Sequence, residues 1–201
     1  MHRSPDVPPP ADDLTSRDIA SIGGSPIGET IPAFLTPMIG RERELQRISD
    51  LLRERAARLV VLTGPGGVGK TRLAVAVAQH VRDAFADGAT LISLAGVSSE
   101  MQVLPAIATA LGIRATGQEH LRNHVRDALA GRDLLLVLDN FEHVVGAAPL
   151  LTDLLSSSYT LSMLVTSRSV LGVYGEFVFP VPTLPIPENP AASPEEIATA
   201  H

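Results

Sequence analysis

Residues 64–71, GPGGVGKT, constrain this chain more than any other feature of its sequence. They fit the pattern G-x-x-x-x-G-K-[ST], in which glycines let consecutive backbone N–H groups turn toward an anion. A helix that begins where such a loop ends adds the positive end of its dipole. In this pattern Lys70 reaches the outer phosphates, and the Thr71 hydroxyl holds Mg²⁺. The segment therefore predicts a binding site for a nucleoside triphosphate.

The residues around this loop fit the strand and the helix that the pattern requires. Residues 59–62 are an unbroken apolar run, typical of a short buried strand. Residues 70–85 repeat a large apolar side chain every four positions, which predicts a helix packed deep against a sheet. A glycine-rich turn without a ligand is the alternative interpretation, and the strand–loop–helix context weighs against it.

Composition excludes several classes of protein. A hydrophobic content of 45% in 201 residues is enough for the core of one domain. The absence of cysteine excludes disulfides, thiol catalysis and cysteine-based zinc sites. The chain has no apolar run of about 18 residues and no signal peptide, so we expect a cytoplasmic protein without membrane contact. A net charge of -6 and the lack of any Lys/Arg-rich run argue against direct nucleic-acid binding by this segment.

Prolines mark the expected domain boundaries. Of the 16 prolines, six lie before residue 33 and six lie from Pro180 onward. We expect residues 1–33 to be a disordered leader, because they mix Pro, Gly, Ser and Asp without periodicity. Residues 34–187 are the expected nucleotide-binding domain. Residues 188–201 read as a linker and the first turns of a helix that stops with the chain, which predicts a truncated helical domain.

Between these ends, strand and helix patterns alternate, which predicts an α/β fold with helices on both faces of a sheet. The expected strands are residues 59–63, 90–94, 134–138, 161–166 and 177–181. The expected helices are residues 41–55, 70–85, 105–111, 121–129 and 144–155. The run at 134–138 consists of five large aliphatic residues, as expected for a central parallel strand covered on both faces.

An acidic residue follows that aliphatic strand. Asp139 stands about 70 residues after the loop, where a carboxylate at a strand end can hold Mg²⁺ together with Thr71. Asn140 comes next, at the position where vigorous ATPases carry a second acid; an amide cannot act as a base. Glu142 is close enough in sequence to substitute for that acid. The alternative role of Glu142 is to stabilise the first turn of the next helix through its dipole.

Two further places carry polar residues with a candidate role. Arg168 follows the predicted strand at 161–166, whose carboxyl end opens on the ligand crevice, and a planar cation there suits a γ-phosphate. Lys70, Arg168 and Glu142 are thus the expected catalytic residues, although a solvated loop arginine is an alternative for Arg168. His120 and His124 share a helix face at i and i+4, but no third metal ligand accompanies them. We therefore expect that face to be exposed and polar.

Four segments together resemble one family of ATPases: MIGRERELQRISDLL, LTGPGGVGKTRLA, LLLVLDNFEHV and LVTSR. They are similar to the STAND-class P-loop ATPases, above all to the nucleotide-binding domains of bacterial AfsR- and LuxR-type transcriptional regulators. NB-ARC domains are more distant relatives. The likeness covers about residues 36–187, and it implies a P-loop NTPase three-layer sandwich. In such a sandwich, helices flank a five-stranded parallel sheet of order 5-1-4-3-2.

The resemblance also implies roles for individual residues. Ile39 and Arg41 would border an adenine pocket, Asp139 would hold Mg²⁺, and Arg168 would act as the first sensor of the γ-phosphate. The expected nucleotide-binding residues are Ile39, Gly40, Arg41, Gly64, Pro65, Gly66, Gly67, Val68, Gly69, Lys70, Thr71 and Arg72.

Motifs and resemblance together predict an ATP/ADP switch that hydrolyses ATP slowly with Mg²⁺, in a signalling or transcription-regulating protein. We expect protein partners or self-association on activation. One alternative is an AAA+-type motor or loader, which would want an acid at position 140 and an arginine finger. Another is a non-catalytic nucleotide-binding interaction module. Family members continue into a helical bundle and a winged helix, so we expect this domain alone to hold nucleotide less tightly.

Overall fold

The computed structural model describes residues 31–32, 38–114 and 117–184. Apart from residues 31–32, the predicted leader lies outside the described residues, and so do the predicted linker and helix at 188–201. In the part of the chain that is described, no helix is both long enough and apolar enough to cross a membrane.

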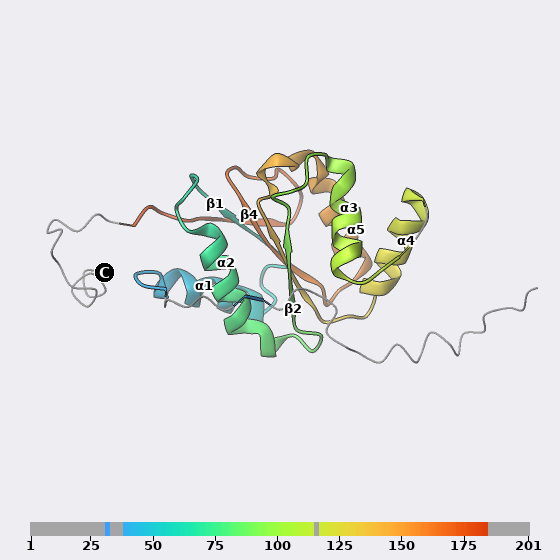
Figure 1. Cartoon of the computed structure of the whole chain (residues 1–201). Coiled ribbons are helices and arrows are strands. Elements are labelled where there is room, and N and C mark those ends of the chain that lie inside the picture. Colours follow the sequence, from blue (N-terminus) through green and yellow to red (C-terminus); the bar gives the residue numbers. More distant parts are fainter. Residues whose placement is uncertain (1–30, 33–37, 115–116, 185–201) are drawn as a thin grey trace, which may run out of the picture.

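One sheet of five parallel strands forms the centre of the molecule (Figure 1). Its strands are β1 (Leu59–Thr63), β2 (Ala89–Ser93), β3 (Leu135–Asp139), β4 (Ser162–Ser167) and β5 (Glu176–Pro180). They lie in the order β2-β3-β4-β1-β5, which confirms the expected order 5-1-4-3-2 counted from the opposite edge. The register pairs Thr63 with Ser167 and Ser93 with Asp139, so the strand ends meet at one edge of the sheet.

Helices cover both faces of the sheet and give the expected three layers. They are α1 (Glu42–Arg53), α2 (Lys70–Val81), α3 (Val103–Ala110), α4 (Gln118–Leu129) and α5 (Ala148–Ser157). Figure 1 shows α1 and α2 on one side of the strands and α3, α4 and α5 on the other. β1, β3 and β4 are consequently buried at every position, which explains why their sequences are mostly apolar.

Alternate residues of each central strand belong to different cores. In β1, Val60 and Leu62 pack in the cluster beneath α1 and α2, whereas Leu59 and Val61 pack in the cluster beneath α3, α4 and α5. This alternation is the two-residue period of an extended chain. The two cores hold β1 from both sides, and so they hold the loop that leaves its carboxyl end.

Two predicted helices differ from the structure by four residues at one end. The helix expected at 70–85 ends at Val81, and a 3₁₀ turn follows at Arg82–Ala84. The helix expected at 144–155 begins only at Ala148, after 3₁₀ turns at Phe141–His143 and Val145–Ala147. Pro149 lies in the first turn of α5, where its missing N–H costs no hydrogen bond. The chain between β3 and α5 is thus a tight connection at the edge of the sheet where the glycine-rich loop lies.

The central place of β4 predicts a strong effect of truncating its core residues. Leu164 has no exposed surface and packs in the cluster beneath α2. We expect Leu164→Ala to lower the free energy of unfolding by about 2–5 kcal/mol, because a buried Leu→Ala change leaves a cavity. Urea unfolding followed by circular dichroism measures this. Val170→Ala, at a side chain that is 53% exposed, is the control and should change stability by less than about 0.5 kcal/mol. Equal losses in both variants would contradict the buried position of β4.

Candidate functional site

Glycines shape the loop between β1 and α2. Gly67 has φ +79° and Gly69 has φ +96°, backbone conformations that residues with a side chain rarely adopt. Gly69 directly precedes the first residue of α2, so the loop ends at a helix N-terminus. A loop of this kind can turn its N–H groups toward an anion, and the helix dipole adds to the attraction. We call residues 64–71 the P-loop from here on.

Gly64 is needed for a different reason, which is the close approach of another segment of the chain. A Cβ atom at this position would lie 3.0 Å from the carbonyl oxygen of Val181 and 3.3 Å from the side chain of Val68. The N–H of Val181 donates to the carbonyl oxygen of Thr63 at 2.7 Å, just before the P-loop begins. The chain that leaves β5 therefore lies directly against the start of the P-loop.

Lys70 is the only lysine in the sequence, and it is 92% buried at the end of the P-loop (8% exposed). Its Nζ donates to the carbonyl oxygens of Gly64 and Pro65, at 2.8 and 2.9 Å. The side chain thus folds back over the loop that precedes it. This places a single positive charge among the backbone groups that would surround a phosphate.

Asp139 and Thr71, the two predicted metal ligands, are in contact. Oδ1 of Asp139 accepts a hydrogen bond from Oγ1 of Thr71 at 2.7 Å and another from Oγ1 of Thr166 at 2.6 Å. Asp139 is buried at the carboxyl end of β3, whereas Thr71 lies in the first turn of α2. A carboxylate next to a hydroxyl is the donor set that Mg²⁺ takes from a protein when it also keeps waters and phosphate oxygens. These residues therefore fit the metal that the P-loop implies.

Thr166 is a site residue that the sequence analysis missed. Its hydroxyl donates to Asp139, and it accepts a hydrogen bond from the backbone N–H of Asn140 at 3.0 Å. Thr166 belongs to the segment VTSR, in which only the arginine received a role. The register pairs Leu138 with Val165, so the next residue of each strand lies at the same level. The expected strand order already made β3 and β4 neighbours and was the signal that could have found Thr166.

Arg168 and Glu142 form an ion pair beside the P-loop. Nε of Arg168 lies 3.1 Å from Oε1 of Glu142, and the Arg168 side chain is 63% exposed against 12% for Glu142. The guanidinium of Arg168 also lies close to the P-loop: a Cβ atom added at Gly66 would be 3.7 Å from its Nη2. Within the described residues, Oε2 of Glu142 is buried without a hydrogen-bond partner. The structure therefore places both candidate catalytic side chains next to each other, with Arg168 close to the loop.

Asn140 has a structural role that its sequence position did not reveal. It takes φ +64° and ψ +44°, the left-handed conformation that asparagine tolerates better than most residues with a side chain. Its backbone turn begins the 3₁₀ turn that contains Glu142. Asn140 thus redirects the chain after Asp139 so that Glu142 comes to lie beside Arg168.

Arg41 lies against the P-loop and bonds to it through a backbone carbonyl. Its Nη1 donates to Oε1 of Glu44 at 2.8 Å, and its Nη2 donates to the carbonyl oxygens of Val68, at 3.3 Å, and of Pro182. The side chain is only 5% exposed. The side chain of Ile39, which is close to Arg41 in the sequence, is exposed to solvent. Contact of Ile39 and Arg41 with adenine stays a prediction.

The remaining residues with a predicted role lie at the beginnings of α1 and α2 and on α4. Gly40 takes φ +73°, and its N–H donates to Oε1 of Glu42 at 3.2 Å, where α1 begins. Arg72 is half-buried in the first turn of α2. His120 and His124 are both exposed on α4, as expected. Among the described residues, no cluster of three or more His, Cys, Asp or Glu side chains is arranged to hold a metal ion.

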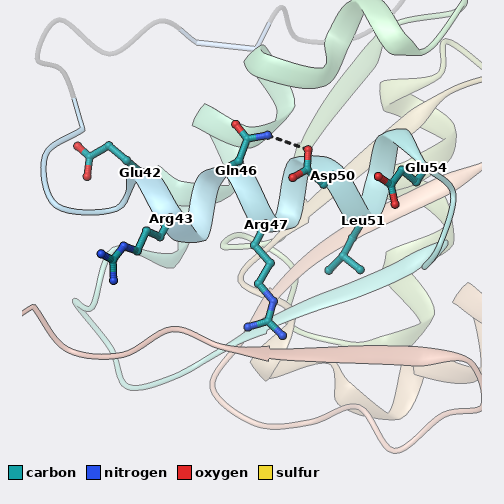
Figure 2. Close-up of a pocket in the computed structure, with 7 residues that line it drawn as sticks. All are labelled: Glu42, Arg43, Gln46, Arg47, Asp50, Leu51 and Glu54. Atoms are coloured by element: carbon teal, nitrogen blue, oxygen red, sulfur yellow. Dashed lines mark hydrogen bonds between the residues drawn. The ribbon is translucent and has the colours of Figure 1, made fainter. Parts of the chain in front are cut away.

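A groove of about 560 Å³ lies along α1 (Figure 2). It is lined by Glu42, Arg43, Gln46, Arg47, Asp50, Leu51 and Glu54. Figure 2 shows that Arg47 extends from α1 toward a neighbouring strand, and its guanidinium lies 5.9 Å from the ring centre of Phe179 in β5. The lining residues belong to α1 except Glu54, which directly follows it, so this groove is separate from the phosphate site.

The family to which the chain belongs follows from comparison with known proteins. The sequence pattern of the AAA domain family matches residues 53–170, more than half of the chain, and includes the P-loop, Asp139 and Arg168. The chain belongs to the AAA domain family. It is therefore an AAA-type P-loop ATPase domain, and the strand order and the P-loop geometry described above agree with that assignment.

Bacterial regulators are among the similar proteins. A protein of Mycobacterium tuberculosis named as an HTH-type transcriptional regulator is 36% identical over 133 residues, which cover 66% of this chain and 15% of that protein. The regulatory protein AfsR of Streptomyces coelicolor is 32% identical over 137 residues, which cover 60% of this chain and 14% of AfsR. These matches confirm the resemblance to AfsR-type regulators. The chain spans only about a seventh of the length of these two relatives.

A solved structure supports the fold. The Orc1 protein of Aeropyrum pernix, determined in complex with DNA, superimposes with a TM-score of 0.59 at 21% sequence identity. The superposition covers 78% of this chain and 48% of that chain. At this level of identity the likeness shows a shared fold.

The contact between Gly64 and Val181 predicts that a methyl group at position 64 disturbs the P-loop. We expect Gly64→Ala to lower the free energy of unfolding by about 1–3 kcal/mol, because the added atom forces the backbone apart. Affinity for MgADP should fall as well. Denaturant unfolding and isothermal titration calorimetry measure the two effects. Gly96→Ala is the matched control, because a Cβ there meets nothing within 4 Å. Identical behaviour of the two variants would contradict the close approach.

Proposed function

We propose that this AAA domain is a switch that binds ATP and ADP, hydrolyses ATP slowly with Mg²⁺, and acts within a transcription-regulating protein. The observation that carries the proposal is the ion pair between Arg168 and Glu142 beside the P-loop. The carboxylate best placed to orient a water is engaged by the cation that would support a γ-phosphate. In this proposal, Arg168 first changes its contacts when a γ-phosphate binds, and hydrolysis of ATP follows slowly.

Binding of the phosphates would fall to the P-loop. Its backbone N–H groups would surround the phosphates, and Lys70 would exchange its contacts with Gly64 and Pro65 for contacts with phosphate oxygens. Thr71 and Asp139 would hold Mg²⁺, which supplies neutralisation of charge on the phosphate oxygens when it is bound. Thr166 keeps the Asp139 carboxylate oriented through its hydrogen bond.

Slow hydrolysis follows from the residues after Asp139. Asn140 cannot accept a proton as a base. Glu142 can orient a water through its buried Oε2, but its other oxygen is held by Arg168. A γ-phosphate would attract the exposed guanidinium of Arg168, because an arginine recognises phosphate with two parallel hydrogen bonds. The exchange of partners by Arg168 therefore distinguishes ATP from ADP, as a nucleotide switch must.

The setting in a larger regulator is supported by the relatives. The Mycobacterium tuberculosis protein and AfsR are named as regulators, and each is far longer than the region that matches this chain. We propose that the domain passes its nucleotide state to other parts of such a protein in the cytoplasm. Protein partners or self-association would follow activation.

Turnover measurements on point variants test the catalytic part of the proposal. We expect the purified chain to hydrolyse ATP below about 1 per second, under the median of typical enzymes. Lys70→Ala and Asp139→Asn should abolish this activity, because they remove the phosphate cation and the metal ligand. Asp127→Asn is the matched control, since Asp127 is exposed on α4, and it should leave turnover unchanged.

The possible outcomes separate the alternatives. Turnover that persists in Lys70→Ala and Asp139→Asn would contradict the proposal that this site hydrolyses ATP. Turnover of many ATP molecules per second would instead favour a motor or loader ATPase. Tight nucleotide binding without any turnover would favour a non-catalytic interaction module.

The single lysine allows a direct test of the phosphate site. An amine-reactive acetylating reagent can modify only Lys70 and the amino terminus of this chain. We expect MgATP and MgADP to protect Lys70 from acetylation by at least about tenfold, because bound phosphates engage its ammonium group. Mass spectrometry measures the modification at both amines. The amino terminus is the internal control, and equal protection of both amines, or of neither, would contradict a phosphate site at Lys70.

A further inference from the structure

The guanidinium of Arg41 joins three segments that are far apart in the sequence. Arg41 directly precedes α1 and contacts Glu44 in the first turn of that helix. Its Nη2 donates both to the carbonyl oxygen of Val68, in the P-loop, and to that of Pro182, in the chain that leaves β5. One side chain thus connects α1, the P-loop and the exit from the last strand.

Burial makes this connection specific. The Arg41 side chain is 5% exposed, and its partner Glu44 is 19% exposed. A buried charge is costly unless it is paired and hydrogen-bonded, and Arg41 meets both conditions through one carboxylate and two carbonyl oxygens. A planar guanidinium can reach acceptors in several directions at once, whereas a lysine ammonium is a point charge on a flexible stem.

A second contact ties the same exit segment to the P-loop. A Cβ atom at position 64 would lie 3.0 Å from the carbonyl oxygen of Val181, so one of the two segments would have to shift. The N–H of Val181 is bonded to Thr63, at the end of β1. Residues 181–182 therefore touch the P-loop at its start, through Gly64, and at Val68, through Arg41. Neither segment can move far without disturbing the other.

We propose that Arg41 is a positioning residue that couples the shape of the P-loop to the position of residues 181–182. The inference rests on the proposed function, in which the P-loop binds nucleotide phosphates. Phosphate binding orders the loop and the Val68 carbonyl, and Arg41 then holds Pro182 in place. By the reciprocity of linked equilibria, a partner that pulls residues 181–182 away weakens phosphate binding by the same factor. Arg41 acts through backbone carbonyls and needs no contact with the base.

The choice of ligand separates this role from a contact with adenine. We expect Arg41→Met to weaken binding of both MgADP and magnesium pyrophosphate by about tenfold, a typical size for coupling between sites. A direct contact with the base would instead weaken MgADP alone, because pyrophosphate has no base. Isothermal titration calorimetry measures both ligands, and circular dichroism checks that the variant is folded.

The matched control is Arg47→Met. Arg47 is an arginine within α1, and its guanidinium packs over Phe179. Both affinities should stay within about twofold of the unmodified chain, as for most surface substitutions. If Arg41→Met fails to fold, Arg41→Lys keeps the charge and should still weaken both ligands equally. A loss confined to MgADP, or no loss for either ligand, overturns the coupling by Arg41.

Hydrogen exchange gives a readout that a merely structural role would not change. In the unmodified chain, pyrophosphate should slow amide exchange in residues 181–184, and in Arg41→Met this effect of the ligand should disappear. Protection that persists in the variant overturns the proposal. If the unmodified chain binds neither MgADP nor pyrophosphate, the proposed function itself fails. If only the proposed role of Arg41 is wrong, the unmodified chain still binds both ligands, so the two failures can be distinguished.

Discussion

The rest of the site depends on one carboxylate oxygen, Oδ1 of Asp139. It accepts hydrogen bonds from Thr71, in the first turn of α2, and from Thr166, which lies near the end of β4. Three elements are thereby joined at the edge of the sheet where the P-loop lies. Because these bonds are made by protein groups alone, the ligands expected for Mg²⁺ are oriented before any metal or nucleotide arrives. The two cores on either face of the sheet hold the strands rigid enough for such short contacts to persist.

The two arginines that contact the P-loop differ in their freedom to move. Arg168 is 63% exposed and held by one ion pair, so it can turn from Glu142 to a phosphate at little cost. Arg41 is 5% exposed and bonded to a carboxylate and two backbone carbonyls, so it moves only if the segments around it move. The first suits a sensor of the ligand and the second suits a mechanical link. A switch needs both, since detecting a γ-phosphate has no effect until another part of the chain responds.

Much of the site could be predicted from the sequence, because its parts are short local patterns. The P-loop, Lys70 and Asp139 lie where the motifs and the aliphatic strand put them, and the strand order followed from the resemblance to AfsR-type ATPases. The hydrogen bond between Thr166 and Asp139 was missed because it joins neighbouring strands, 27 residues apart in the sequence. The partners of Arg41 were beyond prediction for the same reason. Its contact with Pro182 spans 141 residues and is made to a carbonyl oxygen, which every residue carries and no motif marks.

The amino-acid sequence by itself determined the chemistry available at this edge of the sheet. Glycines, one lysine, a threonine and an aspartate stand at spacings that only a strand–loop–helix unit and a following strand can bring together. Tertiary structure alone decided which of these groups are engaged with one another. It paired Arg168 with Glu142, and it enclosed Arg41 between the P-loop and the chain that leaves β5. The physical reason is that such pairings depend on burial and on distances between elements, which arise only when both faces of the sheet are packed.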